Sequence, residues 1–270
     1  SKFNKKYNLM CKIFDIFFLK RYIKLNTNFI VKSELAKEFL VNKGISENNI
    51  TVAGVGIDTQ VLTTEEECSL NIFNEMVQQK ESLKILYVGK IEPRRDSIFL
   101  IDVLKKIIDN GVKAHLYIIG SGEKEYVNSV HEHAKNIDVS KYITWQEKCE
   151  QKYLSNIYKQ ADIFLLPTKY EIFGMVLLEA MYYGCVVATT TNGGSSTLIK
   201  DGKNGIIIDE ENPRIWAEKI LKVMKNYNVK NDISINAHNT IKNNYLWDLL
   251  IEKFIHRYNE VKRKNKSTLE

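Results

Sequence analysis

Two acidic residues, Glu171 and Glu179, are the first candidates for chemistry in this chain. Glu171 precedes a predicted helix that begins near Phe173, and Glu179 lies about two turns inside that helix. A rise of about 1.5 Å per residue places the two carboxylates roughly 10 Å apart along the helix axis, which is too far for one shared proton. We therefore expect them to hold opposite ends of one extended ligand, with phosphates between them at the helix N-terminus.

The alternative for Glu179 is an ordinary solvated position on the helix. Its neighbours in the sequence are apolar: Val176, Leu177, Leu178, Ala180 and Met181. Because an acid in such surroundings needs a partner, the composition of this helix favours a functional carboxylate.

A group of cations follows the predicted strand Lys84 to Val88. The turn after this strand carries Lys90, Arg94 and Arg95 and leads into a predicted helix. Cations beside the free N–H groups of a helix start suit a phosphate. A solvated basic loop is the alternative interpretation of this stretch taken alone.

Two further turns contain glycine. In Gly120-Ser121-Gly122-Glu123 the backbone could pass close to a ligand without a Cβ in the way. The pair is more often a simple tight turn, and Glu125 occupies the position of the last glycine of GxGxxG. Gly193 and Gly194 precede a helix that opens with hydroxyl residues, where Ser195 or Ser196 is expected mainly as an N-cap.

The elements that position these turns alternate from about residue 83, with short β-branched runs between longer helical patterns. The predicted strands are mostly continuous apolar runs, at Lys84 to Val88, His115 to Ile119, Tyr142 to Trp145, Asp162 to Leu166, Val186 to Thr190 and Gly205 to Ile208. The predicted helices are Ser97 to Asn110, Lys124 to Asn136, Gln151 to Gln160, Phe173 to Tyr183 and Ser195 to Lys200. Helices also dominate from Pro213 to about Arg263. The pattern predicts an α/β fold, a doubly wound parallel sheet with a helical C-terminal tail. Its chemistry is expected beyond the carboxyl ends of the strands.

The region before residue 83 has a different pattern. Its first segment is predicted to be a helix with lysines on one side and an apolar face of Phe3, Tyr7, Met10, Phe14 and Phe17, followed by Arg21. Asn28 to Val31, Glu34 to Asn42 and Ile50 to Ala53 predict a small β-α-β piece, which cannot bury its own faces. We expect residues 1–58 to be the end of another domain with a hinge at Gly54 to Asp58, and residues 59–268 to form the main domain.

Composition excludes several classes of protein. The 270 residues are 44% hydrophobic and carry a net charge of +6, and residues 1–24 alone hold seven cations and one acid, so no global basic field for nucleic acid is indicated. No stretch of about 18 uncharged apolar residues occurs. The four cysteines form no CxxC pair, which indicates reduced thiols in a cytosolic chain rather than zinc or disulfides. Leu269-Glu270 is treated as a cloning scar.

The ordered motifs resemble those of the GT-B-fold retaining glycosyltransferases of family 4 (glycosyl transferases group 1), in their C-terminal donor-binding domain. The carrying segments are YVGKIEPRR, IIGSGE, ADIFLLP, the E-x7-E pattern of Glu171 and Glu179, EAMYYG and NGG. The resemblance covers roughly residues 28–260, with Tyr245 to Trp247 similar to the family's closing aromatic motif. The chain departs from the family pattern at Lys90, Arg95, Ile172, Thr197 and Cys185-Val186.

The resemblance implies a Rossmann-like domain that binds a nucleotide sugar without a metal or cofactor. UDP-sugar is the first expectation for the donor, with GDP- or ADP-sugar as alternatives. Lys90 and Arg95 would hold the diphosphate together with Gly120 and the N–H groups of Phe173, Gly174 and Met175. Glu179 would accept hydrogen bonds from ribose hydroxyls, and Glu171, as the catalytic residue, would hold hydroxyls of the transferred sugar.

The sequence allows three hypotheses about function. The first is a fragment of a metal-independent retaining hexosyltransferase of polysaccharide biosynthesis that acts on a carbohydrate or lipid-linked acceptor but is itself inactive when truncated. The second is a non-catalytic nucleotide-sugar-binding module. The third is a peripheral membrane protein that uses residues 1–24, although these could instead pack on a missing domain. The expected location is the cytoplasm, with the inner face of the membrane as an alternative.

Overall fold

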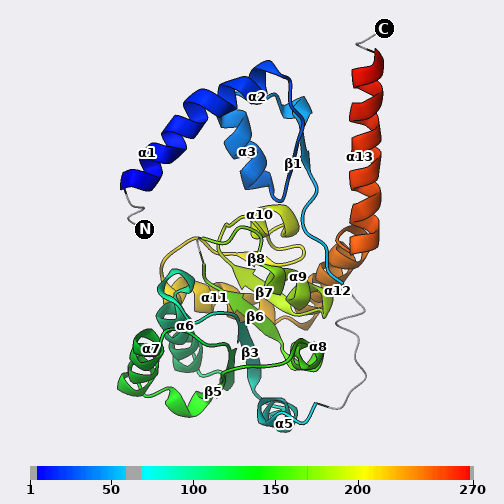
Figure 1. Cartoon of the computed structure of the whole chain (residues 1–270). Helices are drawn as coiled ribbons and strands as arrows, with labels where there is room; N and C mark the ends of the chain where they lie inside the picture. The colour runs from blue at the N-terminus through cyan, green and yellow to red at the C-terminus, as the bar shows by residue number, and fades with distance from the viewer. Residues whose placement is uncertain (1–4, 59–67, 169, 268–270) are drawn as a thin grey trace.

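The computed structural model describes residues 5–58, 68–168 and 170–267. Phe3 of the predicted apolar face, Lys169 of the turn before Glu171, and the residues directly after the predicted boundary at 58 lie outside the described residues. The main part of the molecule is a six-stranded sheet in which all pairings are parallel. Figure 1 shows this sheet between helices, with a smaller N-terminal part above it.

The strands of the large sheet lie in the order β5-β4-β3-β6-β7-β8. Their bounds are β3 Leu83–Val88, β4 Ala114–Ile119, β5 Ile143–Gln146, β6 Ile163–Leu166, β7 Val186–Thr189 and β8 Ile206–Ile207. Every residue of β4, β6 and β7 is buried, as expected for strands covered on both faces. The order starts at β3, runs outward to β5, then returns to β6 on the other side of β3, which is the doubly wound arrangement predicted from the sequence.

Helices cover both faces of this sheet. The bounds are α5 Asn71–Gln78, α6 Ser97–Asp109, α7 Lys124–Asn136, α8 Gln151–Gln160, α9 Met175–Tyr182, α10 Ser195–Leu198, α11 Pro213–Met224 and α12 Tyr227–Asn244. Helix α6 packs with α7 and α11, whereas α8 packs with α5 and α9, and α9 packs with α12. The sequence had not predicted α5, which buries Ile72 and Met76.

The N-terminal part contains the predicted β-α-β piece. Strands β1 (Phe29–Val31) and β2 (Ile50–Val52) pair in parallel, and α3 (Glu34–Asn42) connects them. Ahead of them α1 (Lys5–Phe14) and α2 (Lys20–Lys24) are joined by a π-helical turn, η1, at Asp15–Leu19. Only a small core forms here, made by Leu19, Ile45 and Ile50.

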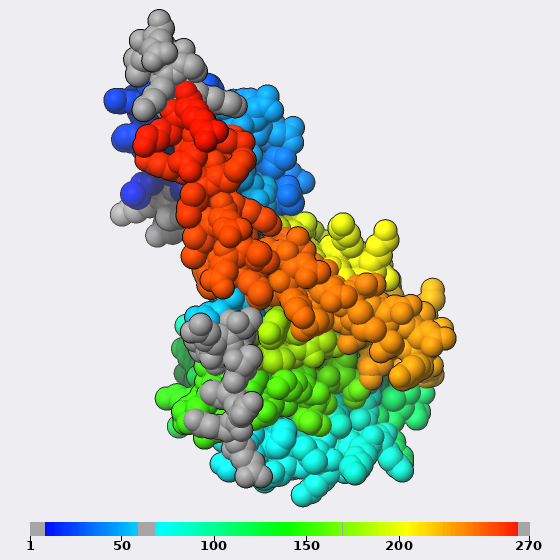
Figure 2. Space-filling view, turned by 90° about the vertical axis from the view of Figure 1, so that its right-hand side faces the viewer, coloured from blue at the N-terminus to red at the C-terminus, as the bar shows by residue number. Residues whose placement is uncertain are grey.

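Several contacts join this part to the large sheet domain. The Glu34 N–H donates to Thr197 Oγ1 at 2.9 Å, and Ile57 pairs with Leu246 in an isolated bridge. From α13 (Trp247–Ser267), Arg257 Nη2 donates to Asn28 Oδ1 at 3.0 Å. Helix α13 therefore runs from the large domain back to the N-terminal part, as Figures 1 and 2 show.

Candidate functional site

The candidate site lies where the connections of the sheet change direction. Strands β3 and β6 are hydrogen-bonded neighbours, although two other strands and three α-helices separate them in the sequence. The loops that leave their carboxyl ends therefore diverge at the usual ligand position of such sheets. Between them lies a hollow of about 160 Å³, lined in part by Arg94 and Tyr170 and called the crevice below. The loop after β3 carries the predicted cations and the loop after β6 carries Glu171.

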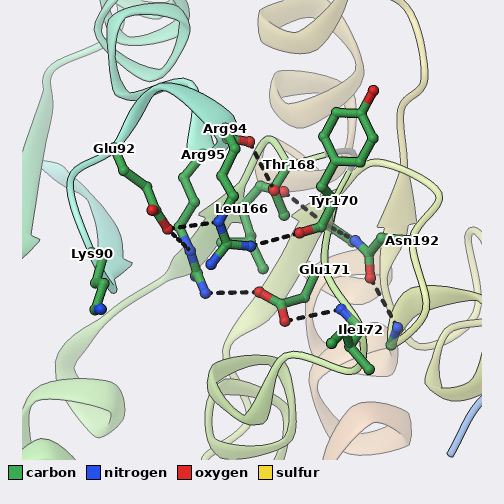
Figure 3. A network of polar contacts seen from close by, with 12 residues as sticks. Lys90, Glu92, Arg94, Arg95, Leu166, Thr168, Tyr170, Glu171, Ile172 and Asn192 are labelled. Atoms are coloured by element: carbon green, nitrogen blue, oxygen red, sulfur yellow. Dashed lines mark hydrogen bonds and ion pairs between the residues drawn. The ribbon is translucent and has the colours of Figure 1, made fainter. Parts of the chain in front are cut away.

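The two loops are joined by a direct ion pair. Arg95 Nη2 lies 2.7 Å from Glu171 Oε2, and the two side chains are only 13% and 12% exposed. Figure 3 shows the guanidinium and the carboxylate facing each other between the two loops. The sequence had placed Arg95 on the diphosphate and Glu171 on the sugar, so the structure brings together two residues that were predicted to hold different parts of one ligand.

The neighbouring arginine also crosses the crevice. Arg94 Nη1 donates to the backbone oxygen of Tyr170 at 2.7 Å, and Thr168 Oγ1 donates to the backbone oxygen of Arg94 at 3.1 Å. Lys90 lies exposed on the same loop, and the ring hydroxyl of Tyr87 donates to its backbone oxygen at 2.7 Å. Burial raises the pKa of Tyr87 to about 12, so this hydroxyl keeps its proton near neutral pH. Lys90 thus presents its charge to solvent while both arginines tie the loops together (Figure 3).

The predicted helix start at Phe173 is wrong by two residues. Helix α9 begins at Met175, and Gly174 precedes it with φ +75°, a left-handed conformation that glycine adopts without steric cost. Glu179 therefore lies only about one turn inside the helix rather than two. Phe173 is buried at 4% exposure, so it contributes packing as well as backbone to this turn.

Glu179 has the partner that its apolar surroundings demanded. Its side chain is 8% exposed, and the hydroxyl of the buried Tyr158 donates to Glu179 Oε2 at 2.9 Å. Burial raises the pKa of Glu179, while the hydrogen bond from Tyr158 lowers it in part. The predicted spacing thus places one carboxylate inside the protein and the other at the crevice.

The glycine turns are explained by loops that touch one another. A Cβ on Gly120 would lie 1.8 Å from the backbone oxygen of Gly89, and one on Gly194 would lie 1.7 Å from that of Phe173. Gly193 N–H also donates to the Glu171 backbone oxygen at 2.9 Å. These glycines let the loops of the site pack at backbone distance.

The expectation that Ser195 or Ser196 caps the next helix is wrong. Gly194 is the residue before α10, and Asn192 Oδ1 accepts hydrogen bonds from the N–H groups of Gly194 and Ser195, both at 3.0 Å. The Ser195 hydroxyl instead donates to the Thr190 backbone oxygen at 2.8 Å. Asn192 therefore fixes the turn that supports the Glu171 loop.

A hollow that the sequence did not predict lies beside Gly120. It measures about 390 Å³ and is lined by Ile91, Gly120, Lys124, His131, Trp145 and Gln146, among others. The His131 and Trp145 rings pack with centroids 4.0 Å apart, and burial lowers the pKa of His131. Trp145 near the end of β5, beside the GSG turn that follows β4, is the sequence feature that could have indicated this hollow. A larger hollow of about 870 Å³ lies at the amino ends of β3 and β4, away from every predicted site residue.

The residues that the structure describes contain neither a metal-binding cluster nor a membrane-spanning helix. Within these ranges no group of three or more His, Cys, Asp or Glu side chains is arranged to hold a metal ion. No helix of the described chain combines the length and the apolar character needed to cross a bilayer.

Comparison with known proteins adds relatives to this geometry. The sequence model of the family described as "Glycosyl transferases group 1" matches residues 70–240. Over 242 residues the chain is 26% identical to the capsular polysaccharide biosynthesis glycosyltransferase CapM of Staphylococcus aureus, a match that covers 86% of this chain and 61% of CapM. The chain spans about half the length of the curated relatives it matches, between 49% and 61% for three of them.

Two solved structures share the fold. A glycosyltransferase from Rickettsia africae ESF-5 superposes with a TM-score of 0.77 at 19% identity, over 92% of this chain and 66% of that chain. Anabaena Alr3699/HepE, solved in complex with UDP and glucose, superposes with a TM-score of 0.73 at 16% identity, over 90% of this chain and 66% of that chain. At these identities the likeness is one of fold, and it confirms the predicted Rossmann-like α/β class.

Proposed function

The chain belongs to the glycosyl transferases group 1 family, and from that premise we propose that it is the donor-binding part of a retaining glycosyltransferase. The fold is GT-B, and the whole protein would transfer a sugar from a nucleotide-diphosphate sugar to a glycan or lipid-linked acceptor. One observation carries the proposal. Cations from the loop after β3, Glu171 from the loop after β6 and the start of α9 meet at the switch point of the sheet.

In this proposal Lys90 and Arg95 hold the donor diphosphate, and Gly120 and the N–H groups of Phe173, Gly174 and Met175 border it. Negative charge develops on the leaving diphosphate during transfer, and fixed cations and the positive end of a helix stabilise such charge. These groups can supply what a metal supplies elsewhere, which supports the proposal of metal independence. Glu171 holds the transferred sugar once it is free of Arg95, and Glu179 accepts hydrogen bonds from the ribose.

The hollow beside Gly120 is where we place the nucleobase. It adjoins the GSG turn at the same carboxyl edge of the sheet, and its walls combine an indole, an imidazole and the amide of Gln146. Such a lining suits a flat, polar-edged ring. UDP-sugar is our first expectation for the donor, since Alr3699/HepE of the same fold was solved with UDP.

We also propose that the domain boundary lies near residue 58, with residues 1–58 as the end of an acceptor-binding domain. The separate β1-β2 sheet and its own small core support this division. A cytoplasmic location is part of the same proposal.

Binding measurements test the donor site. Calorimetry with UDP, GDP and ADP should identify one nucleotide that binds the chain. Lys90→Ala and Arg95→Ala should each lower the affinity for that nucleotide more than the affinity for the matching nucleoside. Lys113→Ala, directly before β4 at the opposite edge of the sheet, is the control, since its ammonium pairs with Glu81. Equal losses for nucleotide and nucleoside would mean that neither cation contacts the phosphates.

A second candidate function, contact with a membrane surface, is favoured by the exposed N-terminal helices. Met10 and Phe17 are 68% and 69% exposed, and Leu9, Ile13, Phe14, Ile16 and Phe18 are also exposed. The inner side, where Leu19 is buried and Lys43 pairs with Asp15, packs on the rest of the N-terminal part. Exposed lysines and Arg21 on the same helices would suit anionic lipids.

Co-sedimentation with vesicles tests this second function. Vesicles that contain phosphatidylglycerol should retain the chain, and Met10→Ser with Phe17→Ser should release it, whereas purely zwitterionic vesicles should retain little. Retention that is unchanged by the double substitution would contradict the contact. The apolar face would then be assigned to protein packing.

A further inference from the structure

Glu92, a residue without an assigned role, lies between the two arginines of the site. Its Oε1 is 2.8 Å from Arg94 Nε and 3.6 Å from Arg95 Nε. The oxygen is buried and, among the described residues, it forms no hydrogen bond, so these contacts are ion pairs rather than aligned hydrogen bonds. Figure 3 shows Glu92 on the opposite side of Arg95 from Glu171.

Each arginine held by Glu92 contacts the loop after β6 through a different atom. Arg94 uses Nη1 for the Tyr170 backbone oxygen, and Arg95 uses Nη2 for Glu171 Oε2, both at 2.7 Å. Glu92 therefore holds the Nε edges of both guanidinium groups, while their outer nitrogens contact the crevice. A single carboxylate sets the direction of two cations.

The two carboxylates that flank Arg95 differ in what they can do. Glu171 lies on the opposing loop, and in the proposed function it must leave Arg95 to reach the sugar. Glu92 lies three residues before Arg95 on the same loop and is the residue that precedes the 3-10 turn Pro93–Arg95. A partner on the same turn can keep Arg95 in place when the other partner leaves.

We propose that Glu92 is a positioning residue that keeps Arg95, and through Arg94 the loop after β6, in the geometry that binds the donor diphosphate. This inference rests on the proposed function. It assigns Glu92 no contact with the ligand. Its effect on affinity passes through the two arginines.

If Glu92 acted through its charge alone, its removal would have the opposite effect on the affinity for an anion. The direction of the change in affinity therefore distinguishes the two explanations. Removing an acid 3.6 Å from Arg95 Nε makes the site more positive, so an anion should bind more tightly if the geometry is unchanged. Loss of a positioning residue should lower the affinity for the anion in spite of that gain. A purely structural role would lower the melting temperature and leave affinity unchanged or improved.

The experiment compares Glu92→Gln, which keeps shape and loses charge, with Glu92→Asp, which keeps the charge on a shorter side chain. Glu125→Gln is the matched control, because Glu125 is an exposed acid in the first turn of α7 at the same edge of the sheet. Calorimetry with UDP, GDP, ADP and inorganic pyrophosphate is run on the full chain, with circular dichroism to confirm folding.

We expect Glu92→Gln to lower the affinity for the nucleotide about tenfold. Removal of residues that support metal ligands lowers metal affinity by a similar factor. Glu92→Asp should recover part of the loss, and Glu125→Gln should change little. Nitrogen-15 NMR gives a second measurement without ligand: the Arg95 Nε signal should broaden in folded Glu92→Gln, because the guanidinium group is no longer held in one position, and should stay sharp in Glu125→Gln.

Affinity that is unchanged or tighter in folded Glu92→Gln, with a wild-type chain that binds a nucleotide, overturns this inference alone. A wild-type chain that binds none of the three nucleotides overturns the proposed function instead, and with it any role of Glu92 at a donor site.

Discussion

At the scale of single residues, the ion pair between Arg95 and Glu171 changes how the site must work. A diphosphate that binds Arg95 competes with Glu171, which holds Nη2 at 2.7 Å in the structure. Both side chains are mostly buried, so the pair is screened less by solvent than an exposed one. Binding of a whole donor can offset the loss of this pair with contacts between Glu171 and the sugar, whereas a free nucleotide has no sugar to offer.

This competition predicts an unusual effect of Glu171→Gln. The variant should bind free UDP, or whichever nucleotide binds the wild type, about three- to tenfold more tightly, because an ion pair worth roughly 1 kcal/mol no longer has to open. Calorimetry on both proteins measures the change. Glu171→Asp, which keeps the charge, is the control, and a clear loss of affinity in Glu171→Gln would contradict the competition.

The buried pair of Glu179 and Tyr158 makes the site sensitive to pH. Burial raises the pKa of Glu179 above its ordinary value, so the folded state favours the protonated acid. Its contribution to stability is therefore present at low pH and is lost as pH rises from the ordinary pKa through the raised one. The ionised carboxylate has no proton to donate, so toward a ribose it acts as a hydrogen-bond acceptor only.

Tyr158→Phe should raise the pKa of Glu179 further, because the hydrogen bond that lowers it would be gone. Carbon-13 NMR titration of the Glu179 side-chain carboxyl measures the shift. Tyr182→Phe, a tyrosine on the same helix as Glu179, is the matched control and should leave that pKa unchanged. A pKa that stays the same in Tyr158→Phe would mean that the hydrogen bond does not favour the charged form.

At the scale of elements, the site depends on loops that pack backbone to backbone. The turn at Gly193 and Gly194 supports the Glu171 loop, and a Cβ on either glycine would come within 2.0 Å of that loop's backbone oxygens. Because backbone atoms cannot rotate away as a flexible side chain can, a substitution here must move the loop itself. The geometry of Glu171 is thus set partly by a turn about 20 residues further along the chain.

Gly194→Ala should therefore destabilise the fold by about 3 kcal/mol, the upper end of the usual cost of overpacking. Gly111→Ala is the control, since its Cβ would meet nothing within 4 Å and only its φ of +75° opposes the change. That control should cost on the order of 1 kcal/mol. Urea denaturation of both variants measures the free energy of unfolding, and equal losses would show that the loop contact is not tight.

At the scale of the whole molecule, the N-terminal part contacts the residues where α12 ends and α13 begins. Tyr245, directly after α12, and Trp247, the first residue of α13, lie against Gly54 and Gly56, where a Cβ would approach their rings within 2.8 and 2.6 Å. The Tyr245 hydroxyl also donates to the Thr197 backbone oxygen at 3.2 Å. The connection at residues 54–56, the aromatic residues Tyr245 and Trp247, and helix α10 are thus in contact with one another.

We expect this 270-residue chain to bind a nucleotide diphosphate but to transfer no sugar. In the proposed function the acceptor is held by a second wall of the cleft, and without it the advantage of orientation, up to roughly 7 to 11 kcal/mol, is largely lost. Assays with purified protein and defined acceptors measure transfer. A version with upstream sequence that completes the first domain should transfer, and Glu171→Ala in that version should abolish most activity; robust transfer by the 270 residues alone would contradict the expectation.

The amino-acid sequence by itself determined the alternation of strands and helices, the parallel sheet and the segments that carry the site. The continuous apolar runs of strands buried on both faces and the stop signals of helices are local patterns, visible in neighbouring residues. It misplaced the start of α9, where Gly174 adopts a left-handed conformation, and it missed α5, a short helix whose Ile72 and Met76 are buried where it packs on α8 and β5. Tertiary structure alone decided that Arg95 pairs with Glu171, 76 positions away, and that Glu92 lies between two arginines. It also decided that the glycines serve loop packing and that Trp145 borders a hollow. The physical reason is that these contacts depend on which strands become neighbours in the sheet, and that order is set by the packing of the whole core.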